Sequence, residues 1–322
     1  MGTGRGAAEV ETWADAERLF LWFCEGKGLA QGTIKQYRYA FRRLEGFIEE
    51  NGGPLTLKEV DRTSLRQFAA YLVNRSPAFP RQGWRRNSGE RLSSKTVHNT
   101  MVSLRTFFKF LADEGIMADN LSSVLVPPPV RQRVIQALTP AQVQALLARP
   151  KRRTFTGQRA HALITLLLDT GLRVSEALSL RVEDVNWREG LLTVMGKGGK
   201  ERQVPFGATV RRLLWRYVAG RGEVLGHELV FAKRSGERLK PRHLQSALKR
   251  YGEKARITGV RLSPHTLRHT FAKMWLLNGG DPFSLQRILG HSSMDMVRRY
   301  VDMTSGDVAA QHRRFSPMDR LT

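Results

Sequence analysis

The stretch Ser263-Pro264-His265-Thr266-Leu267-Arg268-His269 combines the signature of a helix start with side chains that bind anions. Ser263 is a typical N-cap residue and Pro264 suits the first helical position, so a helix is predicted to begin here. His265 and Arg268 are three residues apart and therefore share one face of its opening turns. An anion at this place would meet helix N–H groups, an imidazole and a guanidinium together.

A zinc site is the alternative for this stretch, because His265 and His269 are four residues apart and could bind one ion. The glutamate of an H-E-x-x-H motif is absent, and the sequence offers no obvious third ligand. We therefore expect no metal site here, and we expect His269 to pack against neighbouring side chains.

Arg173 is a second candidate anion-binding residue. It follows Thr170-Gly171-Leu172 and precedes a short helix predicted at 174–178, so its guanidinium would lie where backbone N–H groups converge. Taken singly, the segment is more typical of a surface arginine that pairs with Glu176 or Glu183.

Lys197 lies between Gly196 and Gly198, in a turn that joins strands predicted at 191–195 and 202–205. The turn does not match a P-loop, because the glycine spacing is wrong and no Ser or Thr follows the lysine. The ammonium could reach a ligand beside the sheet, or it could be an ordinary surface group with which Lys200 competes.

A further helix is predicted to begin at Asp281-Pro282 and to end at Gly290. His291 follows directly, and Ser292 and Ser293 can cap the next helix, which carries Tyr300. Taken singly, this histidine is typical of a surface residue and the tyrosine of a core or interface residue.

In chain order, six of these residues resemble the active-site signature of the tyrosine recombinase, or phage integrase, family. They are Arg173, Lys197, His265, Arg268, His291 and Tyr300. Their order and spacing agree with the family, and the resemblance covers essentially the whole chain. It is greatest for the Xer-like and mobile-element recombinases.

The resemblance implies a role for each residue. Tyr300 would attack a DNA phosphodiester, which gives a 3′-phosphotyrosyl bond and a free 5′-hydroxyl. Arg173 and Arg268 would hold the non-bridging oxygens, and His291 would donate a hydrogen bond to the phosphate. His265 would help to remove the phenol proton, and Lys197 would protonate the leaving 5′-oxygen. Such chemistry requires no metal, ATP or other cofactor.

The resemblance also implies partners and a fold. The substrate would be double-stranded DNA. Four protomers, or this protein with a paired recombinase, would act together on two DNA sites. The reaction would serve integration and excision of a mobile element, transposition, or Xer-like resolution. The fold is mainly α with a small β-sheet in the catalytic domain. Its two domains form a DNA clamp: a helical SAM-like core-binding domain at 10–116, a linker at 117–137, and a catalytic domain with a C-terminal tail at 138–322.

The spacing of apolar residues and the positions of the prolines agree with this division. Apolar positions recur at helical spacing over 14–27, 33–51, 62–74 and 94–114, with an irregular basic loop at 77–89. Three consecutive prolines at 127–129 cannot form helix interior and favour an extended connection. Beyond it, helices are predicted from Pro140 and over 159–170. The tail at 301–322 would dock on a neighbouring protomer or pack in cis.

The charge favours nucleic acid as the partner. The 322 residues include 53 Lys and Arg against 29 Asp and Glu, which gives a formal net charge of +24. No acidic residue lies between Asp119 and Asp169, a stretch that contains many arginines. The candidate DNA contacts are Lys35, Arg38, Arg42, Lys95, Arg105, Arg131, Arg133, Arg242, Lys249 and Arg250.

The remaining composition excludes other classes of protein. Cys24 is the only cysteine, so neither an intrachain disulfide nor a zinc finger is possible, and it is expected to be a small core residue. The N-terminus lacks the apolar stretch of a signal peptide, and the longest apolar run, 162–168, is too short to span a bilayer. We therefore expect a soluble, cytoplasmic protein with no membrane partner.

Two other functions fit parts of the sequence. An enzyme like the type IB topoisomerases would relax DNA with the same chemistry in a different domain architecture. A basic DNA-binding regulator could keep the fold without catalysis. Formation of a covalent DNA adduct excludes the regulator, and a four-protomer complex on paired sites excludes the topoisomerase.

Overall fold

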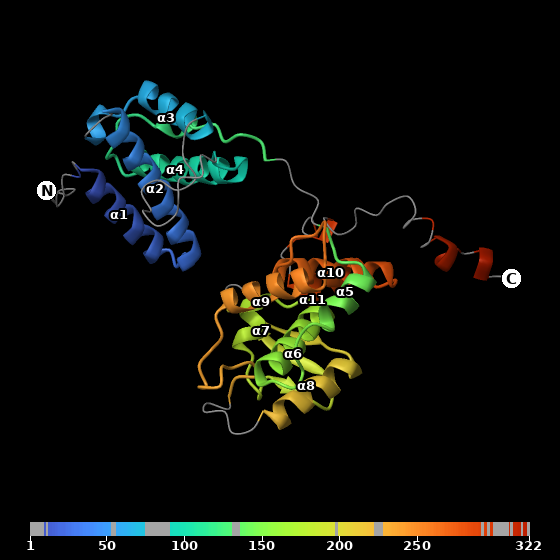
Figure 1. The fold of residues 1–322 in the computed structure, drawn as a ribbon. Coiled ribbons are helices and arrows are strands. Elements are labelled where there is room, and N and C mark those ends of the chain that lie inside the picture. The colour runs from blue at the N-terminus through green and yellow to red at the C-terminus, as the bar shows by residue number, and fades with distance from the viewer. Residues whose placement is uncertain are drawn as a thin grey trace, which may run out of the picture. The chain divides into compact units, whose positions relative to one another are not determined.

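The computed structural model describes residues 10, 12–52, 56–74, 91–130, 136–196, 199–221, 228–290, 293–294, 297–298, 309, 312–316 and 318–320. The chain divides into two compact units, residues 1–132 and 133–322 (Figure 1). The basic loop expected at 77–89 lies outside the described residues.

The first unit contains four α-helices among its described residues: α1 (Trp13–Gly26), α2 (Gln31–Asn51), α3 (Arg62–Asn74) and α4 (Ser94–Asp113). Short 3-10 turns lie at Leu57–Glu59 and Leu121–Val124. The four predicted helices are confirmed. Their ends follow from capping, because the side chains of Thr12 and Ser93 accept backbone N–H groups at the starts of α1 and α4.

Aromatic side chains fill the core of this unit. The Phe20 ring lies edge-on to Tyr37, Phe107 and Phe110, with centroids 4.8, 5.4 and 5.3 Å away. Such edge-to-face pairs add to the hydrophobic gain of burial. Cys24 is 1% exposed, which confirms that it is a core residue.

The packed body of the first unit extends into the stretch expected to be a linker at 117–137. Leu121 is 2% exposed and Leu125 is fully buried, and both belong to the same core as the four helices. The His98 ring also contacts the Pro128 carbonyl oxygen through Nδ1 at 2.9 Å. The connection to the second unit therefore begins later in the chain than residue 117, because these apolar side chains are buried by α3 and α4.

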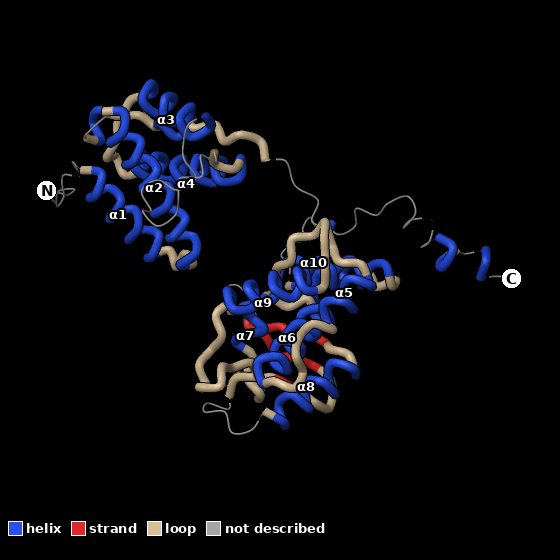
Figure 2. Tube along the Cα trace, in the orientation of Figure 1, coloured by secondary structure: helices blue, strands red, loops and turns tan. Residues whose placement is uncertain are grey.

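The second unit is mainly helical with a small sheet (Figure 2). Its helices are α5 (Pro140–Leu147), α6 (Phe155–Thr170), α7 (Val174–Ser179), α8 (Ala208–Gly220), α9 (Pro241–Lys254), α10 (Pro264–Leu277) and α11 (Pro282–Leu289). Its strands are β1 (Val185–Asn186), β2 (Leu191–Met195) and β3 (Glu201–Pro205), antiparallel in the order β1-β2-β3. The predicted fold class is confirmed, although β1 was not predicted.

The helix α6 lies at the centre of the second core and packs against α8 and α10. Leu163, Ile164, Leu166 and Leu167 are all buried, as expected of a helix that other elements surround. The helix begins at residue 155 rather than 159, because the Thr154 side chain caps it.

The described part of the C-terminal tail contacts its own chain. Arg314 Nη1 donates to the Asn278 carbonyl oxygen at 2.7 Å, just beyond the end of α10. The Phe315 ring lies so close to Gly279 that a Cβ there would be 2.8 Å from it. These described residues of the tail therefore contact the end of α10 in the same chain, and docking on a neighbouring protomer stays a prediction.

Candidate active site

The start of α10 places His265 and Arg268 as the sequence predicts. The Ser263 side chain accepts the backbone N–H of Thr266 at 3.2 Å, and Pro264 is the first helical residue. His265 is exposed, whereas Arg268 is only 6% exposed. One helix face thus carries an accessible imidazole and, one turn later, a buried guanidinium.

The Arg268 guanidinium joins the ends of two other helices. Its Nη1 donates to the Gly171 carbonyl oxygen at 2.7 Å, after the end of α6, and its Nη2 donates to that of Leu289 at 2.8 Å, at the end of α11. Gly171 has φ +61°, and a Cβ there would lie 2.3 Å from the Phe271 ring. Only glycine suits this position, because its backbone is left-handed and the neighbouring ring leaves no room.

Arg173 is the N-cap residue of α7, and Glu176 is its partner. The Glu176 carboxylate accepts the Arg173 backbone N–H at 2.8 Å and Nη1 at 2.9 Å. Nη2 donates to the Gly290 carbonyl oxygen at 3.4 Å. The Arg173 side chain is 36% exposed, so the guanidinium is held from one side and remains accessible to a ligand.

Sequence reasoning did not single out Arg202, which lies on β3. Its Nη1 and Nη2 donate to the two oxygens of Glu176 at 3.0 and 2.9 Å, and its Nε donates to the Ile288 carbonyl oxygen at 3.0 Å. One signal could have found it: Arg202 shares a strand face with the buried Val204, and an inward arginine needs partners.

Glu176 is buried and ionised. Burial by itself raises the pKa of a carboxyl group. Here the hydrogen bonds from Arg202 and from the Arg173 backbone and side chain outweigh burial and hold the pKa of Glu176 below its usual value. Glu176 therefore carries its negative charge between two guanidinium groups at neutral pH.

Three consecutive carbonyl groups at the end of α11 each accept a hydrogen bond from a different arginine. Ile288 accepts from Arg202, Leu289 from Arg268 and Gly290 from Arg173. The C-terminal end of a helix carries partial negative charge, so cations are stabilised there. The chain leaves this end at Gly290, in the left-handed region with φ +63°, and the next residue is His291.

Lys197, His291 and Tyr300 lie outside the described residues. Their flanking segments are described. The Gly196 backbone N–H donates to the Lys200 carbonyl oxygen at 2.8 Å and closes the turn that contains Lys197. Val297, three residues before Tyr300, is fully buried in the core of the second unit. Of the six predicted site residues, the structure thus brings Arg173 and Arg268 together at α11 and places His265 on the helix of Arg268.

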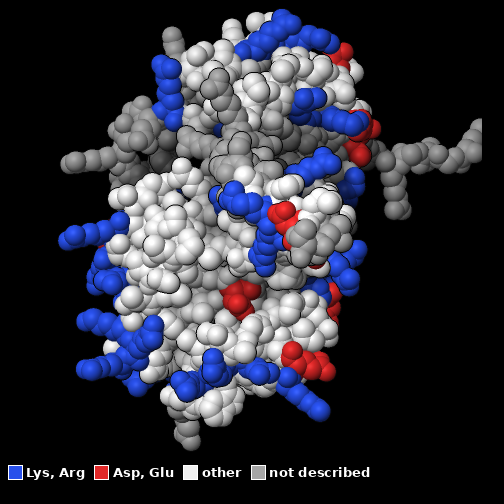
Figure 3. Space-filling view, turned by 90° about the vertical axis from the view of Figure 1, so that its right-hand side faces the viewer, with Lys and Arg blue, Asp and Glu red and all other residues white. Residues whose placement is uncertain are grey.

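The described candidate DNA contacts are exposed. Lys35, Arg38 and Arg42 lie on α2, Lys95 and Arg105 lie on α4, and Arg242, Lys249 and Arg250 lie on α9. Arg131 and Arg133 lie outside the described residues. On the face shown in Figure 3, Lys and Arg side chains outnumber acidic ones. Exposed side chains of this kind can reach the phosphates of a duplex.

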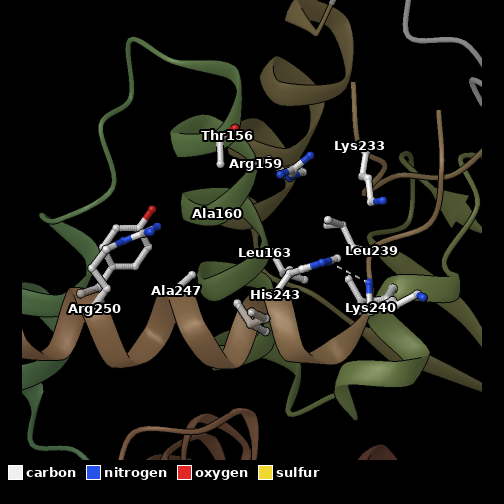
Figure 4. Close-up of a pocket in the computed structure, with 13 residues that line it drawn as sticks. Thr156, Arg159, Ala160, Leu163, Lys233, Leu239, Lys240, His243, Ala247 and Arg250 are labelled. Atoms are coloured by element: carbon white, nitrogen blue, oxygen red, sulfur yellow. Dashed lines mark hydrogen bonds between the residues drawn. The ribbon is translucent and has the colours of Figure 1, made fainter. Parts of the chain in front are cut away.

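A basic pocket of about 260 Å³ lies between α6 and α9 (Figure 4). Leu163 and Leu244 contribute apolar surface, and Arg159, Lys240 and Arg250 contribute charge. The backbone N–H of Lys240 donates to His243 Nδ1 at 3.2 Å. None of the three site residues that the structure describes, Arg173, His265 and Arg268, lines this pocket, so it is separate from the arginines at α11.

The described part of the chain contains neither a cluster of metal ligands nor a helix that could span a membrane. There, no three His, Cys, Asp or Glu side chains gather in a way that could hold a metal ion. No helix in that part has both the length and the apolar character that crossing a bilayer demands.

Comparison with known proteins identifies the family. Residues 136–306 match the phage integrase family, and residues 19–124 match the phage integrase SAM-like domain. The chain therefore belongs to the phage integrase family of tyrosine recombinases. The predicted family, and with it the predicted site-specific recombinase and DNA strand-transfer enzyme, is confirmed. The topoisomerase-like and regulatory alternatives are not favoured.

Relatives of this recombinase match over nearly their whole length. The tyrosine recombinase XerD of Shewanella oneidensis is 32% identical over 301 residues, which are 92% of this chain and 94% of the relative. The XerD of Staphylococcus epidermidis is 30% identical over 295 residues, which are 90% of this chain and 94% of the relative.

Solved structures share the fold of the recombinase. The XerH site-specific recombinase bound to a palindromic difH substrate has a TM-score of 0.70 at 20% identity, with 95% of this chain and 84% of that chain covered. The Tn1549 transposon integrase in complex with transposon right end DNA has a TM-score of 0.68 at 20% identity, with 94% and 99% covered.

Proposed function

We propose that this recombinase cuts and rejoins DNA through a covalent 3′-phosphotyrosyl intermediate formed by Tyr300. The observation that carries the proposal is the convergence of Arg173 and Arg268 on the last two carbonyl groups before His291. Two guanidinium groups held at one helix end, next to a histidine in the chain, provide donors for a single phosphate.

The two arginines stabilise the transition state. Nucleophilic attack on a phosphodiester increases the negative charge on the non-bridging oxygens. Arg173 and Arg268 donate hydrogen bonds to these oxygens, and one such donor typically contributes about 3–4 kcal/mol. His291 donates a further hydrogen bond to the phosphate. Because the arginines are held before DNA binds, little reorganisation is needed at the moment of reaction.

Proton transfer accompanies both attack and departure. A phenol has a pKa of about 10 and is mostly protonated at neutral pH, so Tyr300 needs a base. The exposed imidazole of His265 accepts that proton. Lys197 donates a proton to the 5′-oxygen as the phosphorus–oxygen bond breaks. The strand then carries a phosphotyrosyl group at its 3′ end and a free hydroxyl at its 5′ end.

The intermediate conserves the energy of the broken bond. A 5′-hydroxyl from another strand can attack the phosphotyrosyl group, release Tyr300 and restore a phosphodiester without ATP. We propose that four protomers on two DNA sites perform this exchange. The helical domain, whose packed core extends to Leu125, and the catalytic domain at 138–322 would grip the duplex as a clamp, with Arg131 and Arg133 on the connection between them. Integration, excision, transposition and Xer-like resolution all use this chemistry.

A nicked suicide duplex that contains the target site tests the proposal. The wild type should form a protein–DNA adduct that survives SDS and forms equally well in EDTA. Tyr300→Phe should form none while it still shifts the same duplex in a gel, which shows that only chemistry is lost. No adduct from the wild type on a site that it binds would refute the proposal, and activity lost in EDTA would indicate a metal-dependent nuclease.

A further inference from the structure

We propose that Arg202 is a positioning residue for DNA cleavage. It joins Glu176 to the end of α11 and thereby sets the place of Arg173 and of Gly290, the residue that precedes His291 in the chain. The inference rests on the proposed function, because it concerns how the site is held for attack on the phosphate. Arg202 touches none of the reacting groups itself.

The contacts of Arg202 use all three nitrogens of its guanidinium and reach two partners. Nη1 and Nη2 form a bidentate pair with Glu176 at 3.0 and 2.9 Å, and Nε reaches the Ile288 carbonyl oxygen at 3.0 Å. The Arg202 and Glu176 side chains are only 14% and 5% exposed. A planar fork of this kind fixes both distance and orientation, which a lysine ammonium cannot do.

Arg173 depends on the same carboxylate. Oε1 of Glu176 accepts from Nη1 of Arg173 and Nη1 of Arg202 at 2.9 and 3.0 Å. With Arg202 present, the two arginines and one glutamate carry a net charge of +1. This positive charge is available to attract the phosphate. Without Arg202 the remaining pair is neutral, and Glu176 competes with DNA for Arg173.

Arg202 also supports the end of α11. A Cβ at Gly290 would lie 3.1 Å from Arg202 Cδ, so this backbone rests on the arginine side chain. Gly290 is the residue whose carbonyl oxygen accepts from Arg173, and His291 follows it. The strand β3 pairs with β2 at Arg202 and Val194, which anchors the support in the sheet. One side chain therefore places two parts of the site.

Single-turnover cleavage of the suicide duplex at saturating protein tests this inference. Arg202→Ala should slow adduct formation by about 100-fold, as expected when supporting contacts let a reacting group move by about 1 Å. Affinity for the site should remain near that of the wild type. Arg202→Lys keeps the charge but not the fork, so its rate should be intermediate. Arg181→Ala, which removes an exposed arginine of the same unit, is the matched control and should cleave at the wild-type rate.

A substrate with a neutral methylphosphonate at the scissile position separates positioning from general loss of structure. Arg173 acts on phosphate charge, so the defect of Arg202→Ala should shrink to a few-fold on this substrate. An equal defect on both substrates would overturn the inference. So would a wild-type rate for Arg202→Ala on the phosphodiester.

Two further outcomes complete the test. If Arg202→Ala does not fold, Arg202→Lys decides: an intermediate rate supports the inference, and a wild-type rate overturns it. Absence of any adduct from the wild type overturns the proposed function instead, so the two failures are distinguishable.

Discussion

Arg268 Nη2 donates to the carbonyl oxygen of Leu289 at 2.8 Å, which joins the buried face of α10 to the end of α11. The same guanidinium donates from Nη1 to the Gly171 carbonyl oxygen. Arg268 therefore holds together the two chain segments that lead into Arg173 and His291. The residue that we propose to bind the phosphate is thus also a structural connection inside the catalytic unit.

We expect Arg268→Ala to lower stability as well as to abolish cleavage. The substitution leaves two carbonyl groups without their donor at a buried position, which should cost about 2–4 kcal/mol. Urea unfolding of the full chain measures this loss. Arg173→Ala should cost less, because that side chain is 36% exposed. Equal stability of Arg268→Ala and the wild type would contradict the structural part of the assignment.

Arginines that add to the overall charge and arginines of the site should have different effects on DNA binding. Replacing Arg131 and Arg133 by Ala should weaken binding and flatten its salt dependence, by about 0.9 in the logarithmic slope for each phosphate that the protein no longer neutralises. Arg173→Ala serves as the comparison, because it should bind DNA almost as the wild type does and form no covalent adduct. Titrations at several salt concentrations measure both slopes. If all these variants merely bound more weakly, the separation would be wrong.

Glu17 should make the first unit less stable as the pH rises. Burial raises the pKa of Glu17 to about 7, Glu45 adds to this rise, and Arg42 opposes it. Between about pH 4.5 and 7 the folded chain holds a proton that the unfolded chain has released, so the free energy of unfolding falls across this range. The stability that the protonated Glu17 carboxyl contributes is complete below the pKa of this group in the unfolded chain, and it is lost above about pH 7.

Glu17→Gln should remove this pH dependence. At pH 8 the variant should be more stable than the wild type by about 1–3 kcal/mol, and near pH 4 the two should be similar. Thermal unfolding followed by tryptophan fluorescence at several pH values measures the difference. Glu25→Gln, at an exposed position of the same helix, is the control. An unchanged pH slope in Glu17→Gln would show that Glu17 is not responsible.

Gly171→Ala should destabilise the catalytic unit more than backbone strain alone explains. The alanine would be strained at φ +61°, and its Cβ would also lie only 2.3 and 2.7 Å from the side chains of Phe271 and Leu289. Gly52 has the same φ, +61°, but nothing within 4 Å of its Cβ position. We expect losses of about 1 kcal/mol for Gly52→Ala and about 3 kcal/mol for Gly171→Ala in chemical unfolding. Similar losses of stability in the two variants would mean that the Phe271 ring can move aside without a loss of free energy.

Local signals in the sequence predicted the helices well. The bounds of α3 match the prediction residue for residue. The caps Ser263 and Asp281 and the stop at Gly290 were also predicted correctly. These features depend on residues within one turn of each other, so the sequence pattern contains their physical cause. The predicted start of α6 was four residues too late, because the Thr154 side chain caps the helix and lets it begin at Phe155.

The sequence by itself determined the family, the order of the elements and the residue types that can act on a phosphate. Side-chain chemistry and short-range spacing are sufficient for these conclusions. The role of Glu176 as the shared partner of Arg173 and Arg202 was decided only by the tertiary structure, as was the meeting of three arginines at the carbonyl groups of Ile288, Leu289 and Gly290. Arg173 and Glu176 are only three residues apart, but the other contacts join residues far apart in the chain. Their geometry depends on how α6, α10, α11 and β3 pack around one core.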